Sequence, residues 1–355
     1  MDIDHAAHIE SNTDSSRKLA SIQRVESVVK HPNADALELV TVLGWQVVTR
    51  VGEAKLGDTV VYCEIDSMLP GDAEWLPDAV KLRVAAQSDT SVYRIKTIKL
   101  RGELSQGLLV PLPACLDADL VVGSDVTATL GIRKYEPASF EGVGQLANSS
   151  RPFPSDVLDK TDENRVQSYP ELMAKFVGHN VVATVKMDGM SGTMLVHPDT
   201  KEFLVCSRNF VREFDAKAPF DPYWYVAQKY NIESALRAND HIALQGEVCG
   251  PGIQQNLLGL TDTEFYVFNV IDIQHQRRLP HLAALAFCND NGLRFVPVDT
   301  AFGLPPESWT VNELLEKAKG KYPGTKNERE GLVLRSIDGS LSVKVINNDY
   351  LLKQK

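Results

Sequence analysis

The clearest chemical feature of the sequence is a lysine at the end of an apolar run. Lys186-Met187-Asp188-Gly189 follows the β-branched run VVATV, so an amine and a carboxylate leave one predicted strand two residues apart. Alone, this short pattern is equally explained by a surface lysine entering a tight turn. Further chemistry-bearing residues follow in order: Ser207-Arg208-Asn209, Gly246-Glu247, Phe268, Glu330-Gly331 and Lys344. The ordered series favours a functional site.

The residue types define the chemistry that this set could perform. A lysine amine attacks phosphorus only when unprotonated, and its ordinary pKa of about 10.4 leaves few molecules reactive near neutral pH. A divalent cation and a second lysine, for which Lys344 is the candidate, would lower that pKa. Three carboxylates on separate segments, Asp188, Glu247 and Glu330, could converge on hydrated Mg²⁺ held mostly through water. Any one of these acids alone is more often an ordinary surface residue.

The elements that must position these residues form an α+β region. Strands are predicted at NVVATVKMDG, TMLVHP, EFLVCSRN, HIALQGEVCG, FYVFNVIDI, GLVLRS and LSVKVIN, and helices at PYWYVAQKYNIESALRAN, LPHLAALAFCNDNG and TVNELLEKAKGKY. Because helices do not alternate one for one with strands, a domain built on antiparallel sheets is expected. Pro, Gly and Ser in residues 134–155 mark its boundary, and we expect it to span residues 146–355.

Residues 17–145 predict a small antiparallel barrel. Short runs rich in Val, Ile, Thr and Tyr, such as ALELVTVLGWQVVTRV and DTVVYCEIDSML, are separated by turn residues. A barrel of the oligonucleotide/oligosaccharide-binding (OB) type is the natural candidate. Residues 1–16 are polar and aperiodic, which predicts a flexible tail.

One run of the barrel is distinctly basic. It contains no acid and four cations: Arg94, Lys96, Lys99 and Arg101. We expect a bulge at Thr97-Ile98, which would bring the cations onto one face and bury Ile95, Ile98 and Leu100. A stripe of this kind suits a nucleic-acid backbone. A solvated strand face whose cations form ion pairs with nearby acids is an equally good interpretation.

The ordered motifs resemble those of the covalent nucleotidyltransferase superfamily of polynucleotide ligases and RNA capping enzymes, over residues 160–352. The N-terminal runs resemble the OB domain that the fifth family of ATP-dependent RNA ligases carries ahead of its catalytic domain. The resemblance implies an α+β chain: an N-terminal OB-type β-barrel followed by an antiparallel-sheet nucleotidyltransferase domain of the ATP-grasp-like or DNA ligase-like adenylation type. It covers nearly the whole sequence.

The resemblance also implies roles for individual residues. Lys186 would be the nucleophile that forms lysyl-AMP, and Lys344 would contact the α-phosphate. Phe268 would stack on adenine, although its run FYVFNV alone predicts core packing on one face with Tyr266. The remaining implied contacts are to the ribose (Arg208 and Glu247), to metal (Asp188, Glu247 and Glu330) and to the nucleotide from the upstream segment (Arg165 and Gln167).

Three positions depart from the family pattern. Val185 stands where several ligase branches have Glu, which matters little if backbone groups read the adenine there. Asn269 follows Phe268 where Asp is common, and Ser342 stands where many relatives carry a further lysine. The last change leaves Lys344 as the sole lysine of its motif.

The leading hypothesis is an ATP-dependent RNA ligase of RNA repair that uses Mg²⁺ or Mn²⁺. It would seal a nick between a 3′-hydroxyl RNA end and a 5′-phosphate in an RNA-containing duplex, acting as a monomer. A DNA ligase or a GTP-dependent capping enzyme is the nearest alternative, but both usually carry their OB domain after the last motif. A catalytically inactive OB-containing nucleic-acid-binding protein is more remote, because Lys186, Glu247, Glu330 and Lys344 occur together.

Composition agrees with a globular protein of two domains. The 355 residues are 43% hydrophobic and 24% charged, which excludes disordered and fibrous classes. No stretch predicts a membrane span or a secretory signal, so an intracellular location, cytoplasmic or nuclear, is expected. The five cysteines are scattered and argue against a disulfide framework or a zinc site.

The net charge of −10 would ordinarily disfavour a nucleic-acid partner. Its distribution is uneven, because residues 1–145 hold 14 basic and 21 acidic residues and the remainder holds 23 and 26. Four of the acids lie in the tail, and others belong to the expected metal site. Nucleic-acid binding should therefore be salt-sensitive and confined to a patch.

Overall fold

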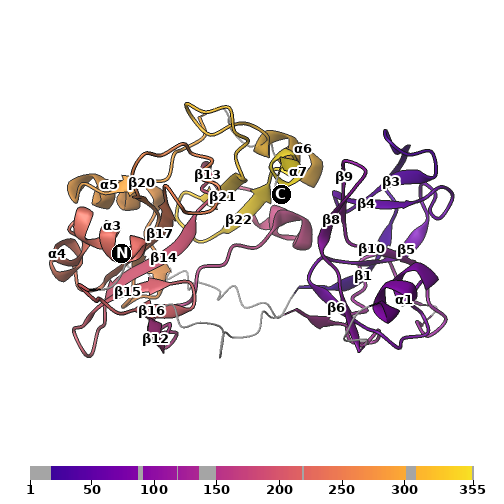
Figure 1. Ribbon diagram of the computed structural model, residues 1–355, viewed down its shortest axis with the longest axis horizontal. Helices are drawn as coiled ribbons and strands as arrows, with labels where there is room; N and C mark the ends of the chain where they lie inside the picture. Colours follow the sequence, from indigo (N-terminus) through magenta and orange to yellow (C-terminus); the bar gives the residue numbers. More distant parts are fainter. Residues whose placement is uncertain are drawn as a thin grey trace. The chain divides into compact units, whose positions relative to one another are not determined.

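The computed structural model describes residues 17–86, 91–117, 119–135, 149–217, 220–300 and 309–353. The predicted tail and most of the predicted linker lie outside these residues. The described chain divides into two compact units (Figure 1). One comprises residues 17–135 together with 167–170 and 351–353, and the other comprises 149–166 and 171–350. We call them the barrel unit and the catalytic unit.

The barrel unit consists of short antiparallel strands. Its sheets, in spatial order, are β1 (Ala20–Arg24), β5 (Thr59–Cys63) and β10 (Leu108–Pro111); β2 (Ser27–Lys30), β3 (Leu37–Val42) and β4 (Trp45–Arg50); β11 (Arg133–Lys134), β6 (Ser67–Pro70) and β7 (Val92–Arg94); and the pair β8 (Thr97–Leu100) and β9 (Glu103–Gln106). The helix α1 (Asp78–Ala85) lies between β6 and β7 in the chain. Trp45 and Tyr62 are fully buried in the core.

The basic run does not contain the expected bulge. It breaks into β7 and β8, which pair with different strands. At the break, the backbone of Ile95 is bonded to Ser67 and Asp66. Ile95 is buried as predicted, but Ile98 and Leu100 remain half-buried. The prediction of one bulged strand is therefore wrong, because hydrogen bonding to the β6 segment redirects the chain at Ile95.

The catalytic unit contains two antiparallel sheets and one parallel strand pair. The large sheet has the order β12 (Ser149–Pro152), β16 (Phe210–Arg212), β15 (Phe203–Ser207), β14 (Met190–Val196), β17 (Ile242–Cys249), β18 (Glu264–Asp272) and β19 (Arg277–Arg278), and β20 (Arg294–Phe295) runs parallel to β18. The small sheet has the order β13 (Val181–Lys186), β21 (Gly331–Ser336) and β22 (Ser342–Ile346). The predicted antiparallel architecture is confirmed.

Helices cover these sheets. α3 (Pro222–Lys229), α4 (Ile232–Arg237) and α5 (His281–Asp290) pack with the large sheet around a core that includes Val226, Leu236 and Phe265. α6 (Val311–Ala318) packs near β22, and the short elements are η2 (Val166–Ser168), α2 (Leu172–Lys175) and α7 (Asn348–Lys353). None of the helices in the described part of the chain is both long and apolar enough to cross a membrane.

Local sequence explains where the helices begin and end. The Asp221 side chain caps α3 by accepting hydrogen bonds from the backbone N–H groups of Tyr223 and Trp224. Thr310 and Glu313 form a capping box at the start of α6. The sequence predicts one helix through PYWYVAQKYNIESALRAN, but Asn231 adopts a left-handed φ of 48° and splits it into α3 and α4.

Candidate active site

Lys186 is the last residue of β13, opposite Gly331 at the start of β21. Its Nζ lies 2.8 Å from the Glu330 carboxylate, and 25% of its side chain is exposed. A second contact fixes the surrounding backbone: the hydroxyl of buried Tyr322 donates to the Lys186 carbonyl at 3.0 Å and accepts from the Glu330 N–H at 3.2 Å. Sequence reasoning missed Tyr322, because it lies in an irregular segment that carries no motif.

Gly331 allows β13, β21 and β22 to approach closely. Its φ is +152°, and a Cβ atom there would lie 2.1 Å from the Val345 carbonyl oxygen. No real side chain tolerates such a contact with backbone. The glycine after Glu330 is therefore required by the packing of the sheet that presents Lys186.

The charges of the three predicted metal ligands, Asp188, Glu247 and Glu330, all act on Lys186. Glu247, on β17, accepts a hydrogen bond from the Gly189 N–H, and burial followed by repulsion from Glu330 and Asp188 raises its pKa to about 7. Burial and the charge of Glu330 likewise raise the pKa of Asp188. Acids that are hard to ionise together gain from a nearby cation.

The same carboxylates also raise the pKa of Lys186, because they favour its charged form. Burial lowers its pKa, but attraction to Glu330 and Glu247, with a smaller part from Asp188, outweighs burial and leaves the pKa above its ordinary value. A lowered pKa was expected for Lys186, because a nucleophilic amine must be unprotonated, whereas its surroundings raise the pKa. The carboxylates hold Lys186 as an ammonium ion until another cation competes for them.

The carboxylate cluster fits a hydrated divalent cation. Asp188 Oδ2 is buried without a hydrogen-bond partner, so it retains a free acceptor. Over the described ranges, no three His, Cys, Asp or Glu side chains are arranged to hold a metal ion directly. Asp188, Glu247 and Glu330 thus lack the geometry of a direct cage, whereas contact through water remains open to them.

Lys344 and Arg208 are brought together by an acid that sequence reasoning did not assign. Asp162 lies 3.4 Å from Lys344 Nζ through one carboxylate oxygen and 3.4 Å from the Arg208 guanidinium through the other. Burial lowers the pKa of Lys344, and the charges of Lys186 and Arg165 add to that effect although Asp162 opposes it. The four basic side chains therefore lie in one region: Lys186, Lys344, Arg165 and Arg208.

The upstream segment is held beside β22 by backbone contacts. The Lys344 N–H donates to the Asn164 carbonyl at 2.8 Å, and Arg165 forms a parallel bridge with Lys344. Arg165 is thus placed with the predicted site. Gln167 belongs to the barrel unit, where its buried amide donates to the Gly44 carbonyl. Its contact with the nucleotide stays a prediction.

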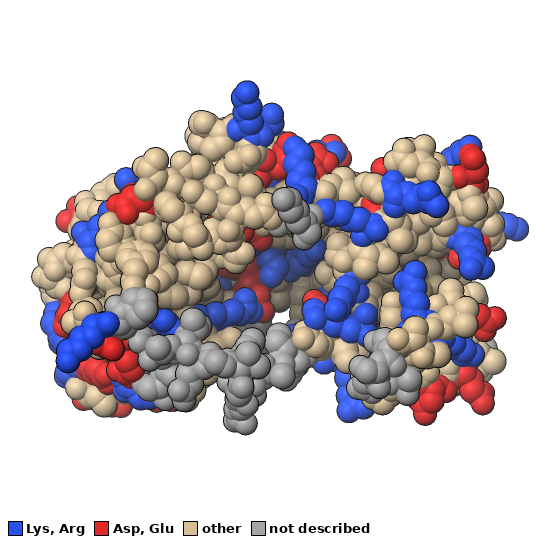
Figure 2. All heavy atoms as spheres, viewed as in Figure 1, with Lys and Arg blue, Asp and Glu red and all other residues tan. Residues whose placement is uncertain are grey.

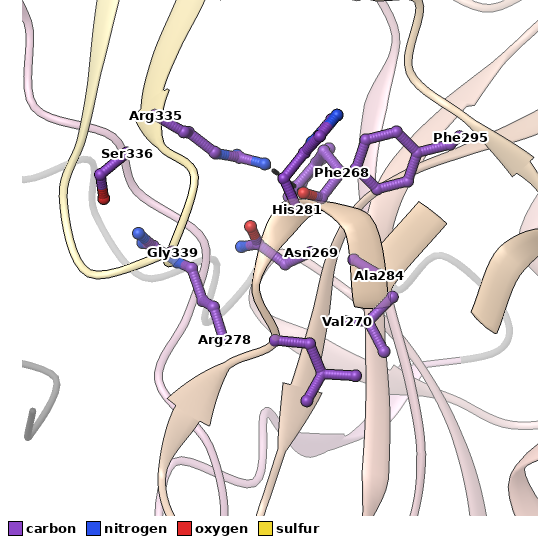
Figure 3. Close-up of a pocket in the computed structure, with 11 residues that line it drawn as sticks. Phe268, Asn269, Val270, Arg278, His281, Ala284, Phe295, Arg335, Ser336 and Gly339 are labelled. Atoms are coloured by element: carbon purple, nitrogen blue, oxygen red, sulfur yellow. Dashed lines mark hydrogen bonds between the residues drawn. The ribbon is translucent and has the colours of Figure 1, made fainter. Parts of the chain in front are cut away.

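Phe268 packs against an apolar cluster that contains Val185 and Met187, the two neighbours of Lys186 in the chain. As predicted, it shares a face of β18 with Tyr266, and both rings pack against buried Val185, Met187 and Tyr322. Phe268 also lines a cavity of about 20 Å³, together with Asn269, Arg335 and His281 among others (Figure 3). Arg335 donates to the Phe268 carbonyl across this cavity.

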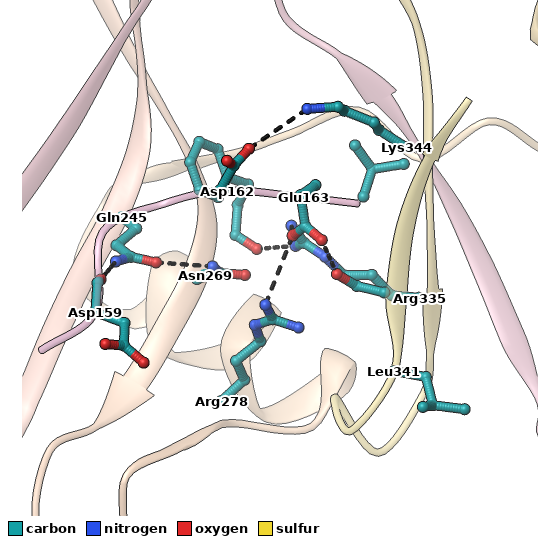
Figure 4. A network of polar contacts seen from close by, with 12 residues as sticks. Asp159, Asp162, Glu163, Gln245, Asn269, Arg278, Arg335, Leu341 and Lys344 are labelled. Carbon is teal, nitrogen blue, oxygen red and sulfur yellow. Dashed lines mark hydrogen bonds and ion pairs between the residues drawn. The ribbon is translucent and has the colours of Figure 1, made fainter. Parts of the chain in front are cut away.

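A buried ionic network links the segment upstream of β13 to β19, β21 and β22 (Figure 4). Glu163 accepts from Arg335 at 3.1 Å and from Ser342, and Arg278 lies 3.7 Å away. Burial raises the pKa of Glu163, but Arg278 and Arg335, with help from Ser342, hold it below the ordinary value. Ser342, which departs from the family pattern, thus donates a hydrogen bond to Glu163 in the segment upstream of β13.

The four cations of the basic run differ in their exposure and in their ion pairing. Arg94 is paired with Asp66 at 2.6 Å and lies 3.4 Å over the Tyr135 ring, whereas Lys96, Lys99 and Arg101 are exposed. Arg94 therefore agrees with the interpretation in which a nearby acid forms an ion pair with the cation. On the face shown in Figure 2, the barrel unit carries several groups of Lys and Arg.

Comparison with known proteins assigns both units. A family model described as OB-fold domain matches residues 19–112, and one described as RNA ligase matches residues 179–353. A complex of Naegleria gruberi RNA ligase with PPi is 34% identical to this chain, with 95% of this chain and 99% of that one covered at a TM-score of 0.73. The chain belongs to the RNA ligase family.

Two further structures of the relative agree. The apo form of a Naegleria gruberi RNA ligase mutant is 33% identical, covering 95% of this ligase and 98% of that chain at a TM-score of 0.74. A mutant with ATP and Mn is also 33% identical, covering 95% and 99% at a TM-score of 0.73. Among curated proteins, no match was found. This ligase therefore combines an N-terminal OB fold with a ligase nucleotidyltransferase domain, as the sequence predicted.

Proposed function

We propose that this RNA ligase uses ATP and seals nicks through a covalent lysyl-AMP intermediate. Lys186 Nζ attacks the α-phosphorus of ATP, so that a P–N bond forms and pyrophosphate leaves. The AMP is transferred to a 5′-phosphate end, which frees Lys186. A 3′-hydroxyl then attacks the activated phosphate and expels AMP. The observation that carries this proposal is the amine of Lys186 held 2.8 Å from Glu330 at the end of β13.

The nucleotide and metal follow from the relative and from the donor set. The Naegleria gruberi enzyme has been captured with ATP and Mn and with AMP and Mn. The carboxylates of Asp188, Glu247 and Glu330 would hold Mg²⁺ or Mn²⁺ here, and the free acceptor on Asp188 supports that fit. Such an ion would neutralise phosphate charge and weaken the hold of the carboxylates on the Lys186 proton.

The protein's own residues supply orientation and charge. The Phe268 ring would stack on the base, a contact worth about 1–3 kcal/mol. Lys344 would stabilise charge developing on the α-phosphate, and Arg208 would contact the ribose. Both cations are held by Asp162 in the absence of ATP. Nucleotide binding would therefore exchange this internal carboxylate for the negatively charged substrate.

We propose that the polynucleotide substrate is a nicked duplex with an RNA 3′-hydroxyl end, bound by a monomer. The exposed cations Lys96, Lys99 and Arg101 support contact between the barrel unit and a phosphate backbone. RNA selectivity would require contacts to 2′-hydroxyls or to A-form geometry.

Labelling tests the covalent step. Incubation with [α-³²P]ATP and Mg²⁺ should leave label that stays on the wild-type protein through denaturing electrophoresis, resists alkali and is released by acid, and should leave none on Lys186→Ala. Lys201→Ala is the matched control, because that lysine is 60% exposed and paired with Asp240 on the protein surface. Label on Lys186→Ala, or labelling by GTP instead of ATP, would refute the proposal.

A substrate panel tests the polynucleotide. Nicked duplexes with RNA or DNA on each side of the nick are incubated with ATP and excess enzyme. We expect sealing to depend on RNA at the 3′-hydroxyl side. Equal sealing of an all-DNA nick would contradict the assignment of RNA as the substrate.

A further inference from the structure

Tyr322 belongs to a tight hairpin, residues 320–329, whose chain continues directly into Glu330. The Tyr322 N–H donates to the Asn327 carbonyl at 3.0 Å, and the N–H of the last residue of the hairpin donates to the carbonyl of the first at 2.9 Å. The two arms are therefore joined twice. These contacts fix the backbone of Tyr322 relative to the chain that enters β21.

The ring of Tyr322 is fixed as well. It is 2% exposed and belongs to the apolar cluster that contains Val185 and Met187, the residues on either side of Lys186. Buried side chains are close-packed, so the ring has little freedom to turn. Its hydroxyl is thereby held at one place beside the end of β13.

The hydroxyl joins the backbone of the nucleophile to that of its acid. It donates to the Lys186 carbonyl at 3.0 Å and accepts from the Glu330 N–H at 3.2 Å. The side chains of the same two residues meet as well, with 2.8 Å between the Lys186 amine and the Glu330 carboxylate. One oxygen atom therefore ties together the two backbones whose side chains form the central ion pair of the site.

Glu330 has a second backbone anchor. The Asn347 N–H donates to the Glu330 carbonyl at 2.9 Å, which holds Glu330 beside the end of β22. Loss of the Tyr322 hydroxyl would leave this contact in place. What the hydroxyl adds is the link from Glu330 to the carbonyl of Lys186.

We propose that the Tyr322 hydroxyl is a positioning group for the formation of lysyl-AMP, because it sets the place from which the Lys186 amine reaches the α-phosphorus. The inference rests on the proposed function, in which Lys186 is the nucleophile. Tyr322 acts through the backbone of Lys186 and not on the substrate. Attack needs accurate placement of the reacting atoms, and a displacement of about 1 Å can cost about 100-fold in rate.

Tyr322→Phe keeps the ring and removes only the hydroxyl. Labelling with [α-³²P]ATP and Mg²⁺ over a range of ATP concentrations gives the maximal rate of labelling and the ATP concentration at half that rate. We expect the maximal rate to fall about 10-fold and the half-saturating ATP concentration to stay within about 2-fold of wild type. A displaced amine slows attack on bound ATP but does not weaken ATP binding.

Sealing of a nick that already carries AMP on its 5′-phosphate supplies a readout that general damage to the fold would not spare. The nucleophile in this step is the 3′-hydroxyl, so the position of the Lys186 amine matters less. We expect Tyr322→Phe to seal this substrate within about 3-fold of the wild-type rate. A labelling rate equal to wild type, a loss confined to the half-saturating ATP concentration, or an equal fall in labelling and sealing overturns the inference.

Tyr62→Phe is the matched control. Tyr62 is fully buried in the barrel unit, and its hydroxyl donates to the Gln106 carbonyl at 2.7 Å. The variant therefore loses the same group from the same kind of contact, but one that does not involve Lys186. It should label at the wild-type rate. A fall as large as that of Tyr322→Phe overturns the inference.

The wild-type protein separates this inference from the function on which it rests. Label on the wild type that is lost in Lys186→Ala upholds the proposed covalent step, whatever Tyr322→Phe does. Absence of label on the wild type overturns both.

Discussion

The amine of Lys186 lies 2.8 Å from the Glu330 carboxylate and is a stronger base than a free lysine because of that contact and its neighbours. Without ligands, Lys186 is therefore held as an ammonium ion. In the proposed reaction, the carboxylates would have to engage a different positive charge, which would couple the chemistry of Lys186 to metal and nucleotide.

Glu330→Gln removes one carboxylate from this arrangement. We expect formation of lysyl-AMP to fall about 100-fold, because the metal loses charge stabilisation and the amine loses its anchor. Single-turnover labelling with ATP and Mg²⁺ measures the rate. Glu316→Gln, which alters a largely exposed acid of α6, should behave as wild type. An unchanged rate in Glu330→Gln would remove Glu330 from the mechanism.

Lysyl-AMP formation should accelerate as pH rises from 7 to 9. The pKa of Lys186 is raised, so protons leave the amine only at high pH and the reactive fraction grows with pH. A divalent cation at the carboxylates reduces their attraction for the ammonium group, so higher Mn²⁺ concentrations should move the profile to lower pH. Profiles at two Mn²⁺ concentrations provide the measurement. Profiles that coincide would contradict this coupling.

Phe268→Ala should raise the KM for ATP by about 5- to 160-fold, in line with about 1–3 kcal/mol for a base stacked on an aromatic ring. The effect on kcat should be smaller, because the ring does not contact the reacting phosphorus. Phe268→Tyr retains an aromatic face and is the control. A loss confined to kcat would argue against stacking.

Glu163→Gln should destabilise the catalytic unit at pH 7 by about 3–5 kcal/mol, because Arg278 and Arg335 lose the charge that compensates them. The folded pKa of Glu163 is lowered, so its stabilising effect is complete above its unfolded value of about 4.5 and disappears as pH falls through the folded pKa. The gap between wild type and variant should therefore narrow at acidic pH. Urea unfolding at pH 7 and pH 4 measures it, and a constant gap would refute the charge argument.

Lys96→Ala should weaken binding to nicked RNA similarly for all sequences and reduce the slope of log affinity against log salt by about one. Lys30→Ala removes another exposed cation of the barrel unit, one that is paired with Asp35, and serves as the control. Fluorescence anisotropy at several salt concentrations gives both slopes. Equal slopes in wild type and Lys96→Ala would remove this surface from the RNA-binding site.

Much of the site could be predicted because strands are recognisable in the sequence as β-branched runs or as alternating apolar and polar residues. The run VVATVK fixed Lys186 at a strand end, and the order of Glu247, Phe268 and Glu330 follows the order of β17, β18 and β21. Alternation also placed Phe268 and Tyr266 on one face. These features depend on local sequence and on family resemblance.

The remaining features depend on contacts between distant segments. Tyr322 reaches Lys186 across 136 positions of sequence, and Glu163 reaches Ser342 across 179. The Gln167 amide donates to the Gly44 carbonyl, 123 positions away in the sequence. The direction of the pKa shift of Lys186 followed from three carboxylate positions that no spacing reveals.

Gly331 has a consequence for natural variation in this enzyme. Its side chain touches no substrate because it has none, yet a single added methyl group would force β21 away from β22 and displace the lysine opposite. In a mutational scan scored by RNA sealing, position 331 should tolerate as few replacements as the nucleophile itself. A harmful allele at that position would be misjudged as a defect of substrate contact, when what fails is the spacing between two strands.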